Sequence, residues 1–263
     1  MCADSAMAST PPPAADDPFP LRARYLDVPV MLTAELEKRF DDVVIVDVRS
    51  QYEYDTLRIM DARLIPLTSK KFVDEVRKLR AETSKIIVFY CNGKACAKSY
   101  DAVLKARSVR VHDAYSYDAG IADWAHAHPE KTALLGRSPI KVEDLISKER
   151  FKSHLLEPQS FEAKMGASAM VLDVRDRAQR DTPLFPFQEQ RATLEGSARI
   201  DTIIDQARRE KKTLLIYDAV GKQVEWFQYY LESKGLGDYY FMQGGAQAYF
   251  DAKYGKVTLG KGK

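Results

Sequence analysis

Residues Ile86–Ala102 read IIVFYCNGKACAKSYDA, and the fold of the chain can be worked out from this segment. Its first five residues are all β-branched or aromatic, which is typical of a buried strand. Cys91 follows at once, then a short turn that contains Gly93, and then a sequence that can form a helix over 99–106. We therefore expect a thiol at the carboxyl end of a strand, facing the amino-terminal end of a helix.

This position favours the ionised form of the thiol. Main-chain N–H groups of such a turn, the helix dipole and the nearby cations Lys94 and Lys98 all stabilise a thiolate. Because the thiolate is the nucleophilic form of cysteine, the pattern predicts sulfur chemistry at Cys91. The alternative is a buried packing cysteine, which Gly93 and the two lysines make the weaker interpretation.

The chain repeats its own pattern. Three landmarks of one half recur in the other at offsets of 125 to 127 residues, which indicates a tandem duplication. They are Asp47-Val48-Arg49 with Asp173-Val174-Arg175, the apolar run ending at Cys91 with the run TLLIYD ending at Asp218, and AGIADW at 119–124 with GGAQAY at 244–249.

Apolar strands and amphipathic helices alternate within each copy. The run 43–46 is a strand pattern, 72–79 has its apolar residues on one helical side, and 86–90 is the next strand. This order predicts an α/β fold with two tandem domains, each a mostly parallel central sheet flanked by helices. The expected divisions are a flexible tether at 1–22, domains at 23–137 and 138–255 with their junction within 137–148, and a tail at 256–263.

Composition narrows the function classes. The 263 residues are 45% apolar and 10% aromatic, enough for a core in each domain. Forty basic and 38 acidic side chains leave a net charge of +2 without a basic stripe, so we expect no nucleic-acid partner. Three cysteines and four scattered histidines predict neither a disulfide scaffold nor a metal site.

The first twenty residues, MCADSAMASTPPPAADDPFP, form a small, polar, Pro-rich tether. Two interpretations of Cys2 stand. In the first, Cys2 is the lipid-bearing cysteine of a periplasmic lipoprotein whose signal peptide was trimmed, and its lipid would tether the protein to the membrane. In the second, Cys2 is an incidental cysteine of a cytoplasmic protein.

Both copies resemble rhodanese domains, and residues 25–253 together resemble a tandem rhodanese-like sulfurtransferase. The resemblance is carried by the Asp-x-Arg after the first central strand, the strand–Cys–loop–helix unit at Cys91, and the pair Gly120 and Trp124. It implies that Cys91 takes sulfane sulfur from a small anionic donor such as thiosulfate, becomes a persulfide, and passes the sulfur to a thiol or cyanide-like acceptor. It implies no cofactor.

The resemblance also implies the rest of the site. Loop amides would hold the anionic sulfur, and the substrate-binding residues are expected to be Asn92, Gly93, Lys94, Ala95, Cys96, Lys98 and Arg49. The family loop has six residues with glycine fourth. Because glycine is third here and the helix begins later, we expect a loop longer by one or two residues. Asp218 at the second nucleophile position cannot carry a persulfide, so the second domain is expected to be inactive.

Two further expectations concern single side chains. We expect Asp47 and Asp173 to bind local backbone or to pair with Arg49 and Arg175, rather than to act as catalytic acids. Cys96 either resolves a Cys91 persulfide into a disulfide or packs at the helix start. Packing is slightly favoured, because a short loop need not bring two sulfurs into disulfide geometry.

Other functions use similar patterns. A phosphatase or arsenate reductase closes its cysteine loop with an arginine, but Ala97 stands six residues after Cys91, which disfavours this class. A dithiol redox protein that uses Cys91 and Cys96 and a non-catalytic binding or scaffold module remain open alternatives.

Overall fold

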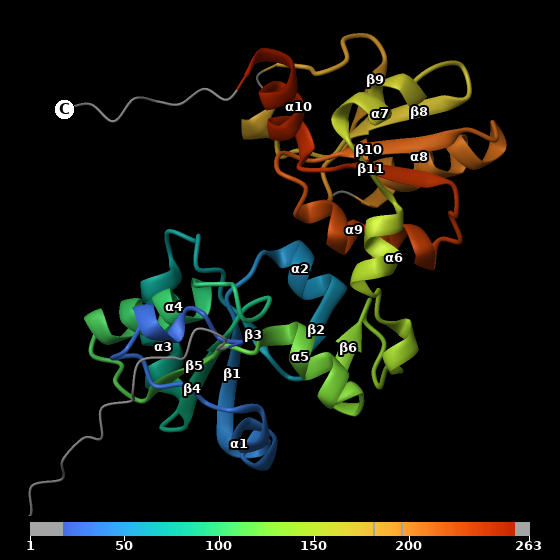
Figure 1. The fold of residues 1–263 in the computed structure, drawn as a ribbon. Coiled ribbons are helices and arrows are strands. Elements are labelled where there is room, and N and C mark those ends of the chain that lie inside the picture. The colour runs from blue at the N-terminus through green and yellow to red at the C-terminus, as the bar shows by residue number, and fades with distance from the viewer. Residues whose placement is uncertain (1–17, 181, 196, 256–263) are drawn as a thin grey trace, which may run out of the picture. The chain divides into compact units, whose positions relative to one another are not determined.

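The chain divides into two compact units, residues 1–142 and 143–263, and each is described by itself. The computed structural model describes residues 18–255 except 181 and 196 (Figure 1). The expectations for Cys2 and for the tail at 256–263 lie outside the described residues. The boundary between the units lies between Val142 and Glu143.

The N-terminal unit is built on a parallel sheet in the order β3-β1-β4-β5, with a two-stranded antiparallel pair, β2 and β6, beside it. Its strands are β1 (Val43–Asp47), β2 (Leu57–Ile59), β3 (Arg63–Leu64), β4 (Ile86–Tyr90), β5 (Ala114–Tyr117) and β6 (Thr132–Leu134). Its helices are α1 (Thr33–Lys38), α2 (Gln51–Thr56), α3 (Phe72–Glu82), α4 (Lys98–Ser108) and α5 (Gly120–Ala127).

Helices cover both faces of this sheet (Figure 1). Alternate residues of a strand point to opposite faces, so Ile87, Phe89 and the following Cys91 share one face. There they form a buried cluster with residues of α3, such as Phe72, and of α4, such as Val103. Cys91 therefore continues the strand side that packs under α3 and α4.

The C-terminal unit repeats the strand order. Its sheet runs β9-β8-β10-β11-β7, and its first four strands correspond in order to β3, β1, β4 and β5. The fifth strand, β7, corresponds to the segment at Val30, which forms a parallel bridge with Ser116 of β5. Its strands are β7 (Leu155–Leu156), β8 (Ala169–Asp173), β9 (Glu189–Arg191), β10 (Thr213–Tyr217) and β11 (Tyr239–Met242). Its helices are α6 (Lys148–Ser153), α7 (Pro158–Lys164), α8 (Ser197–Arg209), α9 (Gln223–Ser233) and α10 (Gly245–Tyr254).

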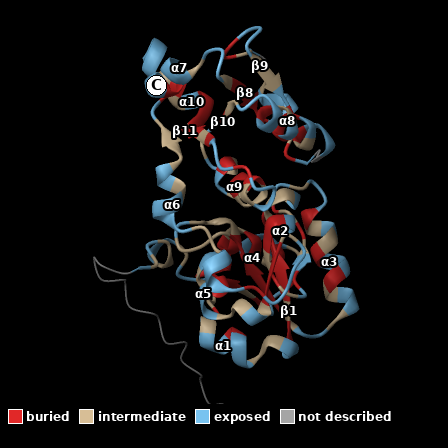
Figure 2. Cartoon of the chain, turned by 90° about the vertical axis from the view of Figure 1, so that its right-hand side faces the viewer, coloured by how far each residue is buried: buried red, intermediate tan, exposed pale blue. Residues whose placement is uncertain are grey.

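The two units share the register in which their strands pair as well as the order of the strands. In the first unit Asp47 is the partner of Tyr90, the last residue of β4, and in the second Asp173 is the partner of Tyr217, the last residue of β10. Buried positions line the strands and the inner helix faces, as the red segments of Figure 2 show. The predicted α/β fold with two parallel, helix-flanked sheets is thus confirmed. Among the described helices none is long and apolar enough to cross a bilayer.

Candidate active site

The loop between β4 and α4 is the centre of the candidate site. β4 ends at Tyr90 and α4 begins at Lys98, so the connection, Cys91–Ala97, has seven residues. This length confirms the prediction of a loop longer than six residues. The corresponding connection between β10 and α9, at 218–222, has only five residues.

A glycine at the start of α5 holds this loop in place. The Ile121 N–H donates to the Cys91 carbonyl at 2.9 Å, so the helix start lies directly against the loop. Gly120 has a φ of +66°, and a Cβ there would lie 2.4 Å from the Gly93 nitrogen. Only glycine allows such an approach. The second unit repeats the contact, with Ala246 N–H donating to the Asp218 carbonyl at 2.8 Å.

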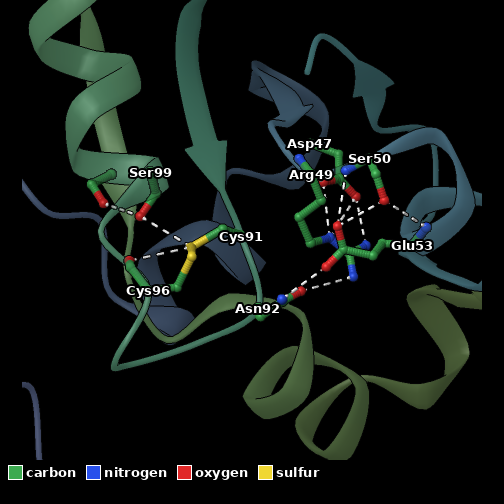
Figure 3. Close-up of a disulfide and its surroundings, with 9 residues drawn as sticks. Asp47, Arg49, Ser50, Glu53, Cys91, Asn92, Cys96 and Ser99 are labelled. Carbon is green, nitrogen blue, oxygen red and sulfur yellow. Dashed lines mark hydrogen bonds and ion pairs between the residues drawn. A yellow bond between two sulfur atoms is a disulfide. The ribbon is translucent and has the colours of Figure 1, made fainter. Parts of the chain in front are cut away.

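Cys91 and Cys96 form a disulfide in this structure (Figure 3). Their Cα atoms are 6.5 Å apart, within the range that a disulfide needs. The Cys96 N–H donates to the Gly93 carbonyl at 2.8 Å, which closes a turn and returns Cys96 toward the strand end. This turn thus brings the two sulfurs together, and Cys96 also packs against the core cluster that contains Cys91.

The Cys91 sulfur is fully buried. It lies 3.3 Å from the Cys96 carbonyl oxygen and 3.8 Å from the Ser99 hydroxyl, in the first turn of α4. Ser116 in β5 is hydrogen-bonded to Ser99 at 2.9 Å. Within the described residues no main-chain N–H donates to this sulfur, so the expected ring of amides does not surround it in the disulfide form.

Four amides do converge on the corresponding residue of the second unit. The Asp218 carboxylate accepts hydrogen bonds from Val220 (3.1 Å), Gly221, Gln223 (2.6 Å) and Val224 (3.3 Å). The start of α9 supplies two of these donors, as helix amino termini do for anions. The second loop is therefore an anion cradle that its own carboxylate fills.

The two lysines of the loop differ in their surroundings. Lys94 forms an ion pair with Asp123 of α5 at 2.8 Å and lies over the Phe19 ring, so its charge is partly balanced. Lys98 is half-buried at the first position of α4. Ala95 is the exposed residue of the loop.

Arg49 is buried and bound to Asp47. Its guanidinium donates to both oxygens of that carboxylate, the shortest contact being 2.6 Å, and to the Leu57 carbonyl. Arg175 and Asp173 form the same pair in the second unit. The prediction that these aspartates pair with the nearby arginines is confirmed.

Asn92 joins this buried pair to the loop. Arg49 donates to the Asn92 side-chain oxygen at 3.3 Å, and the Asn92 amide donates to Glu53 at 2.9 Å (Figure 3). The residue beside Cys91 is thus held by a network from the far side of the sheet. Arg49 reaches the loop through Asn92.

Glu53 is ionised in this network. Burial opposes its charge, but Arg49, the Ser50 N–H, the Asn92 amide and Lys98 more than offset that cost, so the pKa of Glu53 lies below its ordinary value. Sequence reasoning missed Glu53, Ser99 and Asp123. For Glu53 a signal existed, because Ser50-x-x-Glu53 is a capping-box pattern and the structure contains that capping box at the start of α2.

The N-terminal unit, which contains the Cys91 loop, matches a known protein family. Residues 32–127 match the family model of the rhodanese-like domain. The N-terminal unit contains a rhodanese-like domain. The whole Cys91 loop lies within the matched residues, while the C-terminal unit lies beyond them and shares the strand order described above.

Solved structures give distant likenesses. A thiosulfate sulfurtransferase from Pseudomonas aeruginosa is 15% identical, with a TM-score of 0.41, and the match covers 86% of this chain. The chain spans only 43% of that protein's length. A rhodanese-like domain from Anabaena sp. is 25% identical (TM-score 0.36, 46% of this chain and 92% of that one). A human single-domain sulfurtransferase, TSTD1, is 24% identical (TM-score 0.30, 37% and 95%). No curated protein sequence matches the chain.

Proposed function

We propose that this protein is a sulfurtransferase that moves sulfane sulfur through a persulfide on Cys91. The observation that carries the proposal is the place of this residue. Within a rhodanese-like domain, Cys91 follows the central strand β4, and its sulfur lies against the first turn of α4. The helix dipole and the Ser99 hydroxyl there favour the thiolate over the thiol.

The reaction begins from the reduced loop. The Cys91 thiolate attacks the sulfane sulfur of an anionic donor such as thiosulfate, the S–S bond of the donor breaks, and sulfite leaves with the bonding electron pair. The product is a Cys91 persulfide. A thiol or cyanide-like acceptor then takes the outer sulfur and restores the thiolate. No general base is needed, because the attacking group is already ionised.

Residues around Cys91 have supporting roles in this proposal. Asn92, Gly93, Lys94, Ala95, Cys96 and Lys98 form the wall that a small donor meets, with Lys94 and Lys98 supplying positive charge. Arg49 acts as a positioning residue, because it holds Asn92 through the contact at 3.3 Å. The C-terminal unit has no thiol at its corresponding loop, where the Asp218 carboxylate fills the cradle. We propose that this unit is inactive in sulfur transfer.

The test is the rate of sulfite release when thiosulfate is mixed with protein that has been reduced and then freed of reductant, because sulfite reports the attack by Cys91 whichever acceptor takes the sulfur afterwards. Cys91→Ser is expected to lower the rate by at least about a hundredfold, because a hydroxyl in this position is un-ionised and a poor sulfur nucleophile. Cys2→Ser is the matched control and should keep the wild-type rate. Equal rates for Cys91→Ser and the wild type would falsify the proposal.

A further inference from the structure

The loop that carries the nucleophile also carries a second thiol in bonding contact with it. Cys96 is half-buried, whereas Cys91 is fully buried, and the two are joined in a disulfide (Figure 3). The duplicate loop, at 218–222, is two residues shorter and has neither cysteine. The longer loop and the pair of thiols therefore occur together, in the unit whose nucleophile position is a cysteine.

We propose that Cys96 resolves the Cys91 persulfide, so that the protein reduces sulfane sulfur to hydrosulfide at the expense of an external dithiol. This inference rests on the proposed persulfide chemistry and names its acceptor. The Cys96 thiolate attacks the Cys91 sulfur, which is the inner sulfur of the persulfide. The bond between the inner and outer sulfurs breaks, and the outer sulfur leaves as hydrosulfide with the electron pair. The Cys91–Cys96 disulfide remains.

The fold makes this internal step faster than attack by an external acceptor. The turn closed by the Cys96 N–H and the Gly93 carbonyl holds the second thiol within reach of Cys91. A reactant held in contact acts at an effective concentration far above that of any free thiol. An external acceptor is not held in this way and must first diffuse to the outer sulfur.

The disulfide then has to be reduced, and the burial of the two residues indicates how. An external thiolate attacks the more accessible Cys96 sulfur, and Cys91 leaves as the thiolate, which the start of α4 and the Ser99 hydroxyl stabilise. The second thiol of the reductant then attacks the mixed disulfide with Cys96. Cys96 is released as a thiolate, and the reductant leaves as its own disulfide. Over one cycle the dithiol is oxidised by two electrons, and thiosulfate becomes sulfite and hydrosulfide. The partner is therefore a small dithiol or a dithiol reductase protein.

A single-turnover experiment tests this step. Protein with Cys2→Ser is reduced, freed of reductant and mixed with one equivalent of thiosulfate. Sulfite and hydrosulfide are measured, and the intact mass is recorded. We expect equal amounts of sulfite and hydrosulfide, and protein that has lost two hydrogen atoms. In the same background Cys96→Ser should release sulfite, gain the mass of one sulfur atom, and form less than about a tenth of the hydrosulfide, since no internal thiol is in reach.

Each outcome is decisive. A stable persulfide in the protein that retains Cys96 would overturn this inference and leave the proposed sulfurtransferase function intact. Sulfite from neither protein would overturn the proposed function and the inference with it. Cys96→Ala is made beside Cys96→Ser, so that a folding defect or an effect of the new hydroxyl is separated from loss of the thiol.

Discussion

At the scale of single residues, Glu53 links the stability of the site to pH. Its pKa is lower in the folded protein than in the unfolded chain. The carboxylate therefore stabilises the fold above its unfolded pKa, and this contribution is lost as the pH falls through the lower, folded pKa. The network of Arg49 and Asn92 around it supplies the favourable interactions.

The substitution Glu53→Gln should isolate the contribution of the Glu53 charge to the free energy of unfolding. Near pH 7 the variant is expected to be less stable by about 1–3 kcal/mol, because a charged hydrogen-bond acceptor is lost in a half-buried site. Below about pH 4, where the carboxyl is protonated in the unfolded chain, the difference should shrink. Urea unfolding of both proteins across this range measures the effect. A gap that stays constant with pH would contradict the assignment.

At the scale of elements, the contact between the start of α5 and the Cys91 loop depends on Gly120. We expect Gly120→Ala to lower the free energy of unfolding by about 3 kcal/mol or more, because a positive φ and a clash with backbone add together. Gly136 has a φ of +78°, and a Cβ there would meet nothing within 4 Å. Gly136→Ala therefore measures the cost of the backbone conformation alone, about 1 kcal/mol. Urea unfolding measures both variants. If the two substitutions lower the free energy of unfolding equally, the close approach of Gly120 to the loop contributes nothing to stability.

At the scale of the whole molecule, the two units differ in the residue that follows the central strand. Asp218 accepts four main-chain N–H groups in the second unit, while Cys91, bonded to Cys96, stands at the same place in the first. The tandem chain is therefore expected to store one sulfur atom and not two. Cys96→Ser protein loaded with thiosulfate and passed through a desalting column should yield one thiocyanate per chain on treatment with cyanide. Two per chain would mean that the second unit also carries sulfur.

The duplication and the main strands could be read from the sequence because they depend on local patterns. The run at 86–90 coincides with β4, and the helix pattern at 72–79 lies within α3. A continuous apolar run reports a strand buried on both faces, and three-to-four-residue spacing reports a helix with one buried side. The Asp47–Arg49 pair was also predictable, because the two residues are close in the chain.

The surroundings of Cys91 were not predictable in this way. Cys96 lies five residues away, and only the turn at Gly93 decides whether its sulfur meets Cys91 or packs elsewhere. Asn92 and Glu53 are 39 residues apart and meet because β1 and β4 are neighbours in the sheet. The amino-acid order alone determined two α/β copies with a cysteine at one strand end and an aspartate at the other. Tertiary structure alone decided which groups touch that cysteine, because side-chain contacts depend on how segments pack in space and not on their periodicity.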